Sequence, residues 1–128
     1  MPKSTASTAA DLIQIYQCFC DETRLRILNL LTQGALCVCH FQELLGEPQV
    51  KISKHLAYLK SKRLVECTRR QCWMVYSLPM KPKRELHLNL ACLQDCGKTY
   101  PIFKKDLQAR RAIRAKLAWL KDTEACCE

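Results

Sequence analysis

The segment 41–62 constrains the fold more than any other part of this 128-residue chain. It begins with FQELL, whose apolar residues have helical spacing, and is then interrupted by Gly46 and Pro48, which predict a helix end and a tight turn. A second helix is expected from about Gln49 to Lys62. The apolar residues of this helix fall on one face: Ile52, Leu56 and Leu59. Two helices joined by a tight turn are typical of a helix-turn-helix.

The apolar pattern changes period after the second helix. The stretches LVECT and CWMVYSL are rich in β-branched and aromatic residues, which predicts two strands. The polar group 69–71 between them predicts the turn of a hairpin. A hairpin that follows a helix-turn-helix forms the wing of a winged helix-turn-helix, so we expect a mainly α fold with one β-hairpin.

Helical patterns flank this region on both sides. Upstream, one helix is expected from about Ala10 to a predicted N-cap at Asp21, and the next ends at Gly34. Downstream, a helical pattern starts at Arg84, is interrupted at 97–101 and resumes to about residue 121. The chain is long enough for one modest core, so we expect a single domain over 1–128 with a flexible tail at 123–128.

Positive charge is concentrated in the middle of the chain. The formal net charge is +9, and residues 51–84 contain ten Lys and Arg against a single acid, Glu66. Such a block attracts polyanions, with a solvated basic face as the alternative. No apolar run approaches the roughly 20 residues that a membrane span requires, so we expect a cytoplasmic protein with no membrane partner.

The second helix can present polar side chains to DNA. With its apolar face turned inward, the opposite face carries Lys51, Ser53 and Lys54. Gln49 lies at the helix start, where the side chains of a recognition helix reach deepest into the major groove. His55 lies on the flank, where a hydrogen bond inside the protein and a DNA contact are both open.

The wing adds two basic residues to this surface. Arg69 and Arg70 are expected at the wing tip, where they would contact the adjacent phosphate backbone. Such contacts add affinity that depends on salt more than on sequence. The part of the chain that reads DNA is therefore expected at about residues 35–78.

The chain has ten cysteines, which in a reducing compartment indicate metal binding or thiol chemistry. Cys37 and Cys39 are one residue apart, and residues two apart on a regular helix point about 200° away from each other. This pair could therefore chelate one ion only where the helix start is frayed or distorted. Cys92 and Cys96 are four apart and share one helix face, which predicts a two-thiol clamp. Small packed side chains remain the alternative for both pairs.

The segment from about Cys20 to Leu78 contains, in order, DETRLRILNLL, ALCVCHFQELL, QVKISKHLAYLKSKRLVE and WMVYSL. In this it closely resembles the ArsR-type family of metal-responsive bacterial repressors. The resemblance implies a homodimer, paired through helices at about 8–20 and 84–121, that binds an inverted-repeat operator in double-stranded DNA. It also implies that a metal or metalloid releases the DNA. The chain departs from the family at the wing turn, where a Gly is usual and this chain has 70–72 as Arg-Gln-Cys.

Within that family the Cys-Val-Cys pair, here Cys37 and Cys39, is an arsenic or soft-metal site. Trivalent arsenic prefers three sulfurs, yet Gln42 occupies the position where some members carry a third cysteine. Other relatives place thiols in the last helix, which makes Cys92 and Cys96 a second candidate pair. The resemblance therefore implies As(III) as inducer, with Cd(II), Pb(II) and Sb(III) as alternatives.

Two other hypotheses remain open. Cys67 and Cys72 flank the wing turn, and their oxidation to a disulfide would make the protein a redox-responsive repressor. A structural module held by zinc in cysteine sites would not bind DNA at all. An enzyme is not expected, because no nucleophile with an adjacent base and an anion cradle can be assembled from the sequence.

Overall fold

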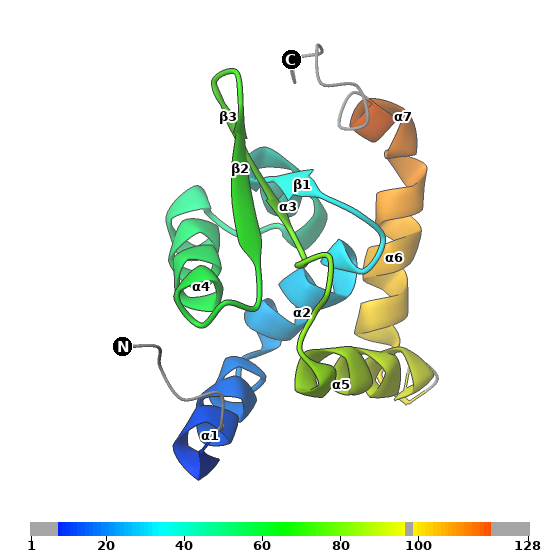
Figure 1. Ribbon diagram of the computed structural model, residues 1–128. Coiled ribbons are helices and arrows are strands. Elements are labelled where there is room, and N and C mark those ends of the chain that lie inside the picture. Colours follow the sequence, from blue (N-terminus) through cyan, green and yellow to red (C-terminus); the bar gives the residue numbers. More distant parts are fainter. Residues whose placement is uncertain (1–7, 97–98, 119–128) are drawn as a thin grey trace.

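The computed structural model describes residues 8–96 and 99–118 (Figure 1). The elements follow one another as α1 (Ala9–Cys18), α2 (Glu22–Leu31), β1 (Leu36–Cys37), α3 (Val38–Leu45), α4 (Gln49–Ser61), β2 (Glu66–Arg70), β3 (Trp73–Ser77), α5 (Arg84–Asp95), α6 (Pro101–Ala112) and α7 (Arg114–Leu117). The predicted mainly α fold with one hairpin, a winged helix-turn-helix, is confirmed. Over the described ranges, no helix combines the length and the hydropathy that crossing a membrane requires.

Local capping residues set several of the helix ends. Asp21 is the N-cap of α2, as predicted, and its side chain accepts a hydrogen bond from the Arg24 amide at 3.1 Å. Gly46 ends α3 with a φ of 68°, a left-handed conformation that favours glycine. The end of α2 differs from the prediction, because the helix stops at Leu31 and Gly34 lies in the following loop with a φ of 127°.

The core is built around α2, which lies between α4 and α6 (Figure 1). α3 and α4 pack on each other and on α2, and they form the helix-turn-helix. The predicted inward face of α4 is confirmed, because its three apolar side chains are fully buried: Ile52, Leu56 and Leu59. Burial of this face fixes the rotation of α4, and so determines which side chains point away from the protein.

The wing belongs to a three-stranded antiparallel sheet with the order β1-β3-β2. The hairpin closes at the pair Arg70 and Trp73, so its turn consists of Gln71 and Cys72. The turn was expected at 69–71, but Arg69 and Arg70 are still in the strand. The two-residue turn that closes the ladder here places Gln71 at a φ of 55°, a left-handed conformation that favours glycine.

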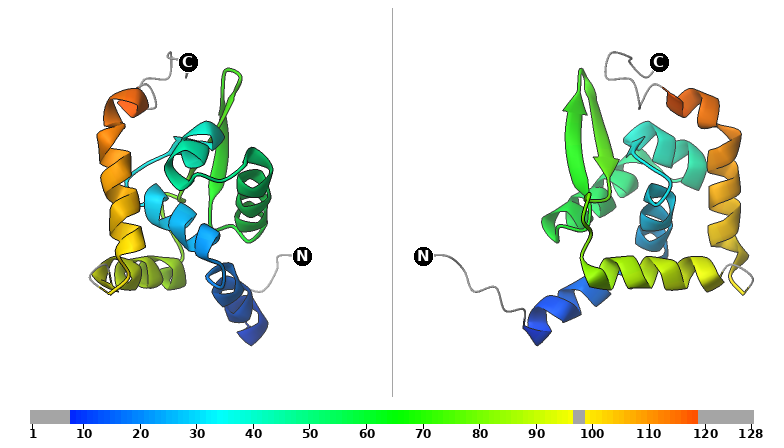
Figure 2. Two further views of the ribbon diagram at one scale, coloured as in Figure 1. Left: turned by 180° about the vertical axis from the view of Figure 1, so that it is seen from behind. Right: turned by 45° about the vertical axis from the view of Figure 1, so that its right-hand side comes forward.

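The C-terminal helices are separate elements that meet at a corner (Figure 2). α6 packs against α2 of the same chain, where Arg26 Nε and Asp106 Oδ2 form an ion pair at 2.7 Å. Asn29 Nδ2 also donates to the carbonyl of Phe103 at 3.0 Å. Part of the segment 84–121 that was predicted for dimerisation thus braces its own chain. The end of that segment, 119–121, and the predicted flexible tail at 123–128 lie outside the described residues.

α1 projects away from the rest of the described chain, at the end opposite the wing (Figure 2). It carries three large apolar side chains that are exposed in a single chain: Leu12, Ile13 and Tyr16. Its C-terminal end is buried in the core through Cys18. α1 is therefore attached at one end and presents an apolar surface along the other turns.

Candidate nucleic-acid interface and thiol sites

The outward face of α4 carries the polar side chains that the sequence predicted there. Gln49, Lys51 and Lys54 are exposed, and Ser53 is half-buried. Lys51 Nζ contacts Glu47 Oε1 at 3.1 Å, an exposed ion pair one turn away that contributes little to stability. α4 therefore offers three exposed hydrogen-bonding side chains from its first two turns, the part of a recognition helix that enters the major groove.

The two basic residues of the wing lie at the end of β2. Arg69 is exposed and its Nε donates to the carbonyl of Gln71 at 2.9 Å, so it supports the turn. Arg70 is half-buried and pairs with Trp73 in the ladder. The hairpin projects beyond the helices that surround it, so both side chains lie near the far end of the wing (Figure 1).

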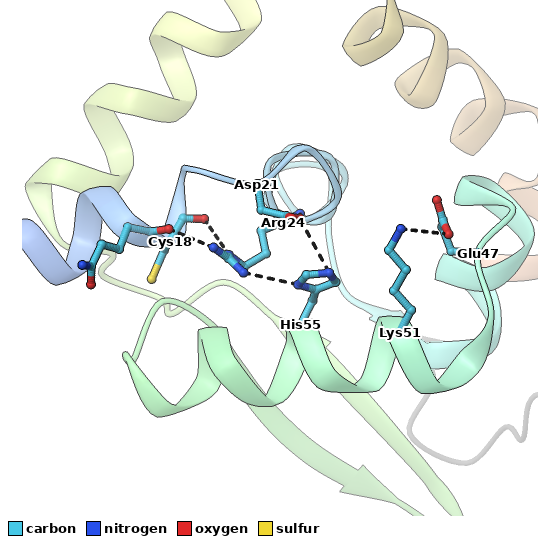
Figure 3. A network of polar contacts seen from close by, with 7 residues as sticks. Cys18, Asp21, Arg24, Glu47, Lys51 and His55 are labelled. Carbon is cyan, nitrogen blue, oxygen red and sulfur yellow. Dashed lines mark hydrogen bonds and ion pairs between the residues drawn. The ribbon is translucent and has the colours of Figure 1, made fainter.

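His55, which the sequence left between two interpretations, is held inside the protein. Its Nδ1 lies 3.4 Å from Arg24 Nη1, and its Nε2 lies 3.6 Å from Asp21 Oδ2 (Figure 3). Burial lowers the pKa of His55, and the opposing charges of Asp21 and Arg24 act on it in opposite directions. His55 therefore braces α4 against the start of α2.

Arg24 was not predicted as a site residue from the sequence, yet it connects three helices. Its Nε donates to the carbonyl of Cys18 at 3.1 Å, and its Nη2 donates to the carbonyl of Gln17 at 2.9 Å (Figure 3). The guanidinium also stacks over the Tyr58 ring at 4.5 Å. The sequence shows that Arg24 comes three residues after the N-cap Asp21. It does not show that Arg24 contacts α1 and α4, because those contacts depend on the tertiary structure.

Cys37 and Cys39 lie where β1 passes into α3. Cys37 is the N-cap residue, with an extended backbone (φ −89°, ψ 166°), and it pairs with Val75 of β3. Cys39 lies in the first turn of α3 and is half-buried, whereas only 1% of Cys37 is exposed. Only one of the two thiols is in the helix, so the angle of about 200° between residues two apart on a regular helix does not describe this pair.

A buried histidine supports this junction. The Cys37 amide donates to His40 Nδ1 at 3.0 Å, which requires an unprotonated Nδ1. Burial lowers the pKa of His40, and the positive charges of Arg110 and Lys116 lower it further while Glu43 raises it. His40 is therefore neutral near pH 7 and holds the backbone of the first thiol in place.

The second predicted pair is close together, as its spacing indicated. Cys92 is on α5 and Cys96 caps its C-terminus. Burial raises the pKa of Cys96, and so do the charge and hydrogen bond of Cys92 and the charge of Asp95. Both thiols line a mainly apolar cavity of about 410 Å³ whose walls include Phe19, from the end of α1. The pair faces the α1 and α5 surface rather than the helices of the helix-turn-helix.

The wing cysteines do not face each other, which corrects the idea of a disulfide within the hairpin. Cys67 pairs with Tyr76, three residue pairs before the ladder ends, whereas Cys72 is in the turn. At about 3.3 Å per residue the two are separated by roughly 10 Å, beyond the ~7 Å that a disulfide spans between Cα atoms. Cys67 instead contacts Tyr76, whose pKa is raised by burial and by the Cys67 hydrogen bond.

A zinc-held module also finds no support in the described part of the chain, where no three His, Cys, Asp or Glu side chains are placed to hold one metal ion. All eight cysteines in that part are thiols. The adjacent pair Cys126 and Cys127 lies outside the described residues.

Comparison with known proteins gives consistent results. A model of the family described as "Bacterial regulatory protein, arsR family" matches residues 21–66. The arsenical resistance operon repressor of Escherichia coli is 42% identical over 67 residues, which cover 52% of this chain and 57% of that repressor. An uncharacterized HTH-type transcriptional regulator of Methanocaldococcus jannaschii is 41% identical over 64 residues, which cover 49% of this chain and 72% of the archaeal protein.

Solved structures show the same fold. A homodimeric winged helix-turn-helix DNA-binding domain from Mycobacterium bovis superimposes with a TM-score of 0.60 at 24% identity. The superposition covers 78% of this chain and 93% of that domain. The match to the E. coli repressor spans little more than half of that protein's length.

Proposed function

The chain belongs to the arsR family of bacterial regulatory proteins, and we propose that it is a homodimeric transcriptional repressor that arsenite releases from its operator DNA. The proposed DNA-binding residues are Gln49, Lys51, Ser53, Lys54, Arg69 and Arg70, with His55 acting indirectly by bracing α4. The proposed sensor is Cys37 with Cys39. Cd(II), Pb(II) and Sb(III) share the soft-ligand chemistry and are the alternative inducers.

One observation carries this proposal: Cys37 is the N-cap of the helix that packs directly on α4. An ion held by Cys37 and Cys39 must pull the first turn of α3 out of its resting geometry, because their backbones are an extended residue and a helical one. The displacement reaches α4 because α3 and α4 form one packed unit. The ligand thus favours a conformation with lower DNA affinity.

The DNA contacts divide into two kinds. Gln49 and Ser53 reach base edges from the first turns of α4, whereas Lys51 and Lys54 contact phosphates. Arg69 and Arg70 contact the backbone beside the major groove. Tyr58 lies under the Arg24 guanidinium and belongs to the bracing network with His55.

The dimer is proposed to form through α1 and α5. Leu12, Ile13 and Tyr16 on α1 and Leu88 on α5 are large apolar side chains that a single chain leaves exposed. Replacement of Ile13, which is 55% exposed, by Lys should shift the protein towards monomer in sedimentation analysis and weaken DNA binding. Unchanged dimerisation would exclude α1 from the interface.

A gel-shift titration tests the inducer. The protein is bound to the DNA upstream of its own operon, and arsenite, cadmium or lead is added. We expect release at micromolar arsenite. Release by cadmium or lead without release by arsenite would overturn the arsenic assignment and retain the repressor.

Cys92 and Cys96 form a second candidate sensor, because their thiols interact with each other on α5 and line an apolar cavity. An ion there would act on the proposed dimer surface rather than on α3. Single Ser replacements at Cys37, Cys39, Cys92 and Cys96, each followed by the same titration, distinguish the two sites.

A further inference from the structure

A cavity of about 340 Å³ connects the three parts of the protein that are proposed to contact or control DNA. Its walls come from the start of α3, from the first residue of α4 and from the end of the wing. Three of the side chains that line it are cysteines: Cys37, Cys39 and Cys72. The remaining walls include Gln42, which occupies the place of a third thiol in the sequence, and Gln49 of α4.

We propose that Cys72 of the wing turn supplies the third sulfur to an arsenic(III) site formed with Cys37 and Cys39. This assignment rests on the proposed function, because it completes the sensor suggested there. Trivalent arsenic prefers three thiolates in a pyramid, and two cysteines from the α3 junction leave one position to fill. Gln42 has no thiol to fill it, whereas Cys72 lines the same cavity from the turn of the wing.

The position of Cys72 in the hairpin lets it move toward α3. It is exposed and lies beyond the last pair of the ladder, Arg70 with Trp73, so the turn can bend without loss of a strand pair. As the described residues stand, no group of three such side chains is close enough to hold one ion. The site therefore closes only when the ligand draws the wing turn and the first turn of α3 together.

This closure explains how the ligand would weaken DNA binding. The wing carries Arg69 and Arg70, and the same cavity is lined by Gln49, so all three move relative to one another when the sulfurs converge. A site that exists only in the closed form binds arsenic better in that form and therefore shifts the population toward it. DNA, which requires the open arrangement, must then bind arsenic-loaded protein less tightly by the same factor.

The chemistry is a ligand exchange without a change of oxidation state. Arsenous acid, As(OH)₃, reacts with the three thiols. Three As–S bonds form, three As–O bonds break, and each thiol proton leaves with a hydroxide as water. Phenylarsonous acid, the hydrate of phenylarsine oxide, has only two exchangeable oxygens and therefore forms two As–S bonds with the release of two waters.

The test compares two single variants of the full chain. Cys72→Ser removes the proposed ligand, and Cys67→Ser is the matched control, because Cys67 is also in the wing but does not line the cavity. We expect Cys72→Ser to raise the arsenite concentration for DNA release by at least about tenfold, because the loss of a group that only supports a metal ligand already costs about that much. Cys67→Ser should stay close to the parent protein. Both variants should respond to phenylarsine oxide almost as the parent does.

Two direct readouts of the site accompany the titration. X-ray absorption at the arsenic edge should give three sulfurs in the parent protein and in Cys67→Ser, and two in Cys72→Ser. Trp73 lines the same cavity, and the chain has two tryptophans. With Trp119→Phe as background, the fluorescence of Trp73 should change on arsenite addition, and the change should be smaller in Cys72→Ser.

The outcomes separate this inference from the proposed function. In one outcome, arsenite releases the parent protein and Cys72→Ser from DNA at the same concentration, and both proteins show three sulfurs on arsenic. Cys72 is then not the ligand, and the proposed function stands. If arsenite binds through three sulfurs that include Cys72 but DNA is not released, the site stands and the proposed sensing function fails. Circular dichroism and DNA affinity without arsenite show that Cys72→Ser is folded. Should that variant fail to fold, Cys72→Ala replaces it.

Discussion

The two predicted thiol pairs differ in what surrounds them more than in their own geometry. Cys92 and Cys96 are one helical turn apart, and their thiols already interact. Cys37 and Cys39 need a distortion at a helix start, but they adjoin the start of α4 and the wing through one cavity. The pair on α5, Cys92 and Cys96, thus lines an apolar cavity away from the DNA-reading elements. Cys37 and Cys39, which are not on one regular helix, lie beside those elements.

This difference indicates that a thiol pair acts as the sensor when ion binding at it changes the conformation of the DNA-binding elements. How easily the pair chelates an ion matters less. An ion that binds two conformations equally well cannot shift their equilibrium, and a clamp whose two thiols share one helix changes little when other parts of the protein move. A site that must be closed by movement has a differential affinity for two conformations. The irregular pair is therefore the better candidate for a switch, and the regular pair for simple ion retention or packing.

The largest expected effect separates the two pairs directly. The double variant Cys37→Ser with Cys39→Ser should require at least about 100-fold more arsenite for DNA release, because it removes ligands themselves rather than their supporting groups. Cys92→Ser with Cys96→Ser should leave the release concentration nearly unchanged. The reverse result in the gel-shift titration would place the sensor on α5.

A second effect concerns the brace between α6 and α2. Replacement of Asp106 by Asn should lower the free energy of unfolding by about 3 kcal/mol, because Arg26 would keep a largely buried charge without its partner. Urea denaturation measures the loss. Since no residue of α6 lines the cavity at the wing, arsenite should release the folded variant from DNA at the parent concentration. A large change in that concentration would mean that α6 also takes part in the switch.

A third effect tests the DNA-reading face without involving the thiols. Lys54→Ala should weaken binding to every DNA sequence by about tenfold and lower the salt slope by about one, as expected for the loss of one phosphate contact. Lys105→Ala removes an exposed lysine of α6 and serves as the control. Equal effects of the two variants would show that general charge, and not the face of α4, determines affinity.

The smallest effect is a pH dependence at the Cys37 junction. His40 is neutral in the folded protein with a pKa below its ordinary value of 6.5, so the unfolded chain binds more protons as the pH falls through that value. The free energy of unfolding should therefore decrease from about pH 7 to about pH 5, above the range where most carboxylates titrate. His55 contributes in the same direction, since burial lowers its pKa as well.

His40→Gln keeps a side-chain acceptor near the Cys37 amide and should flatten this dependence. His87→Gln, at an exposed histidine of α5, is the matched control variant. An unchanged pH profile in His40→Gln would show that His40 does not titrate on unfolding in this range.

The sequence by itself determined the helix-turn-helix, the wing and the inward face of α4. These depend on local periodicity, on Asp21 as an N-cap and on Gly46 as a helix end, all of which act within a few residues. It also indicated the closeness of Cys92 and Cys96, because helical spacing alone brings them together.

The contacts between segments that are far apart in the sequence could be seen only in the tertiary structure. Arg24 reaches His55 across 31 positions, and Arg26 reaches Asp106 across 80, contacts that no local pattern encodes. The strand register separated Cys67 from Cys72, because slipping a hairpin turn by two residues changes every partner. The same turn brought Cys72 to the cavity of Cys37 and Cys39, since β3 pairs with both β2 and β1.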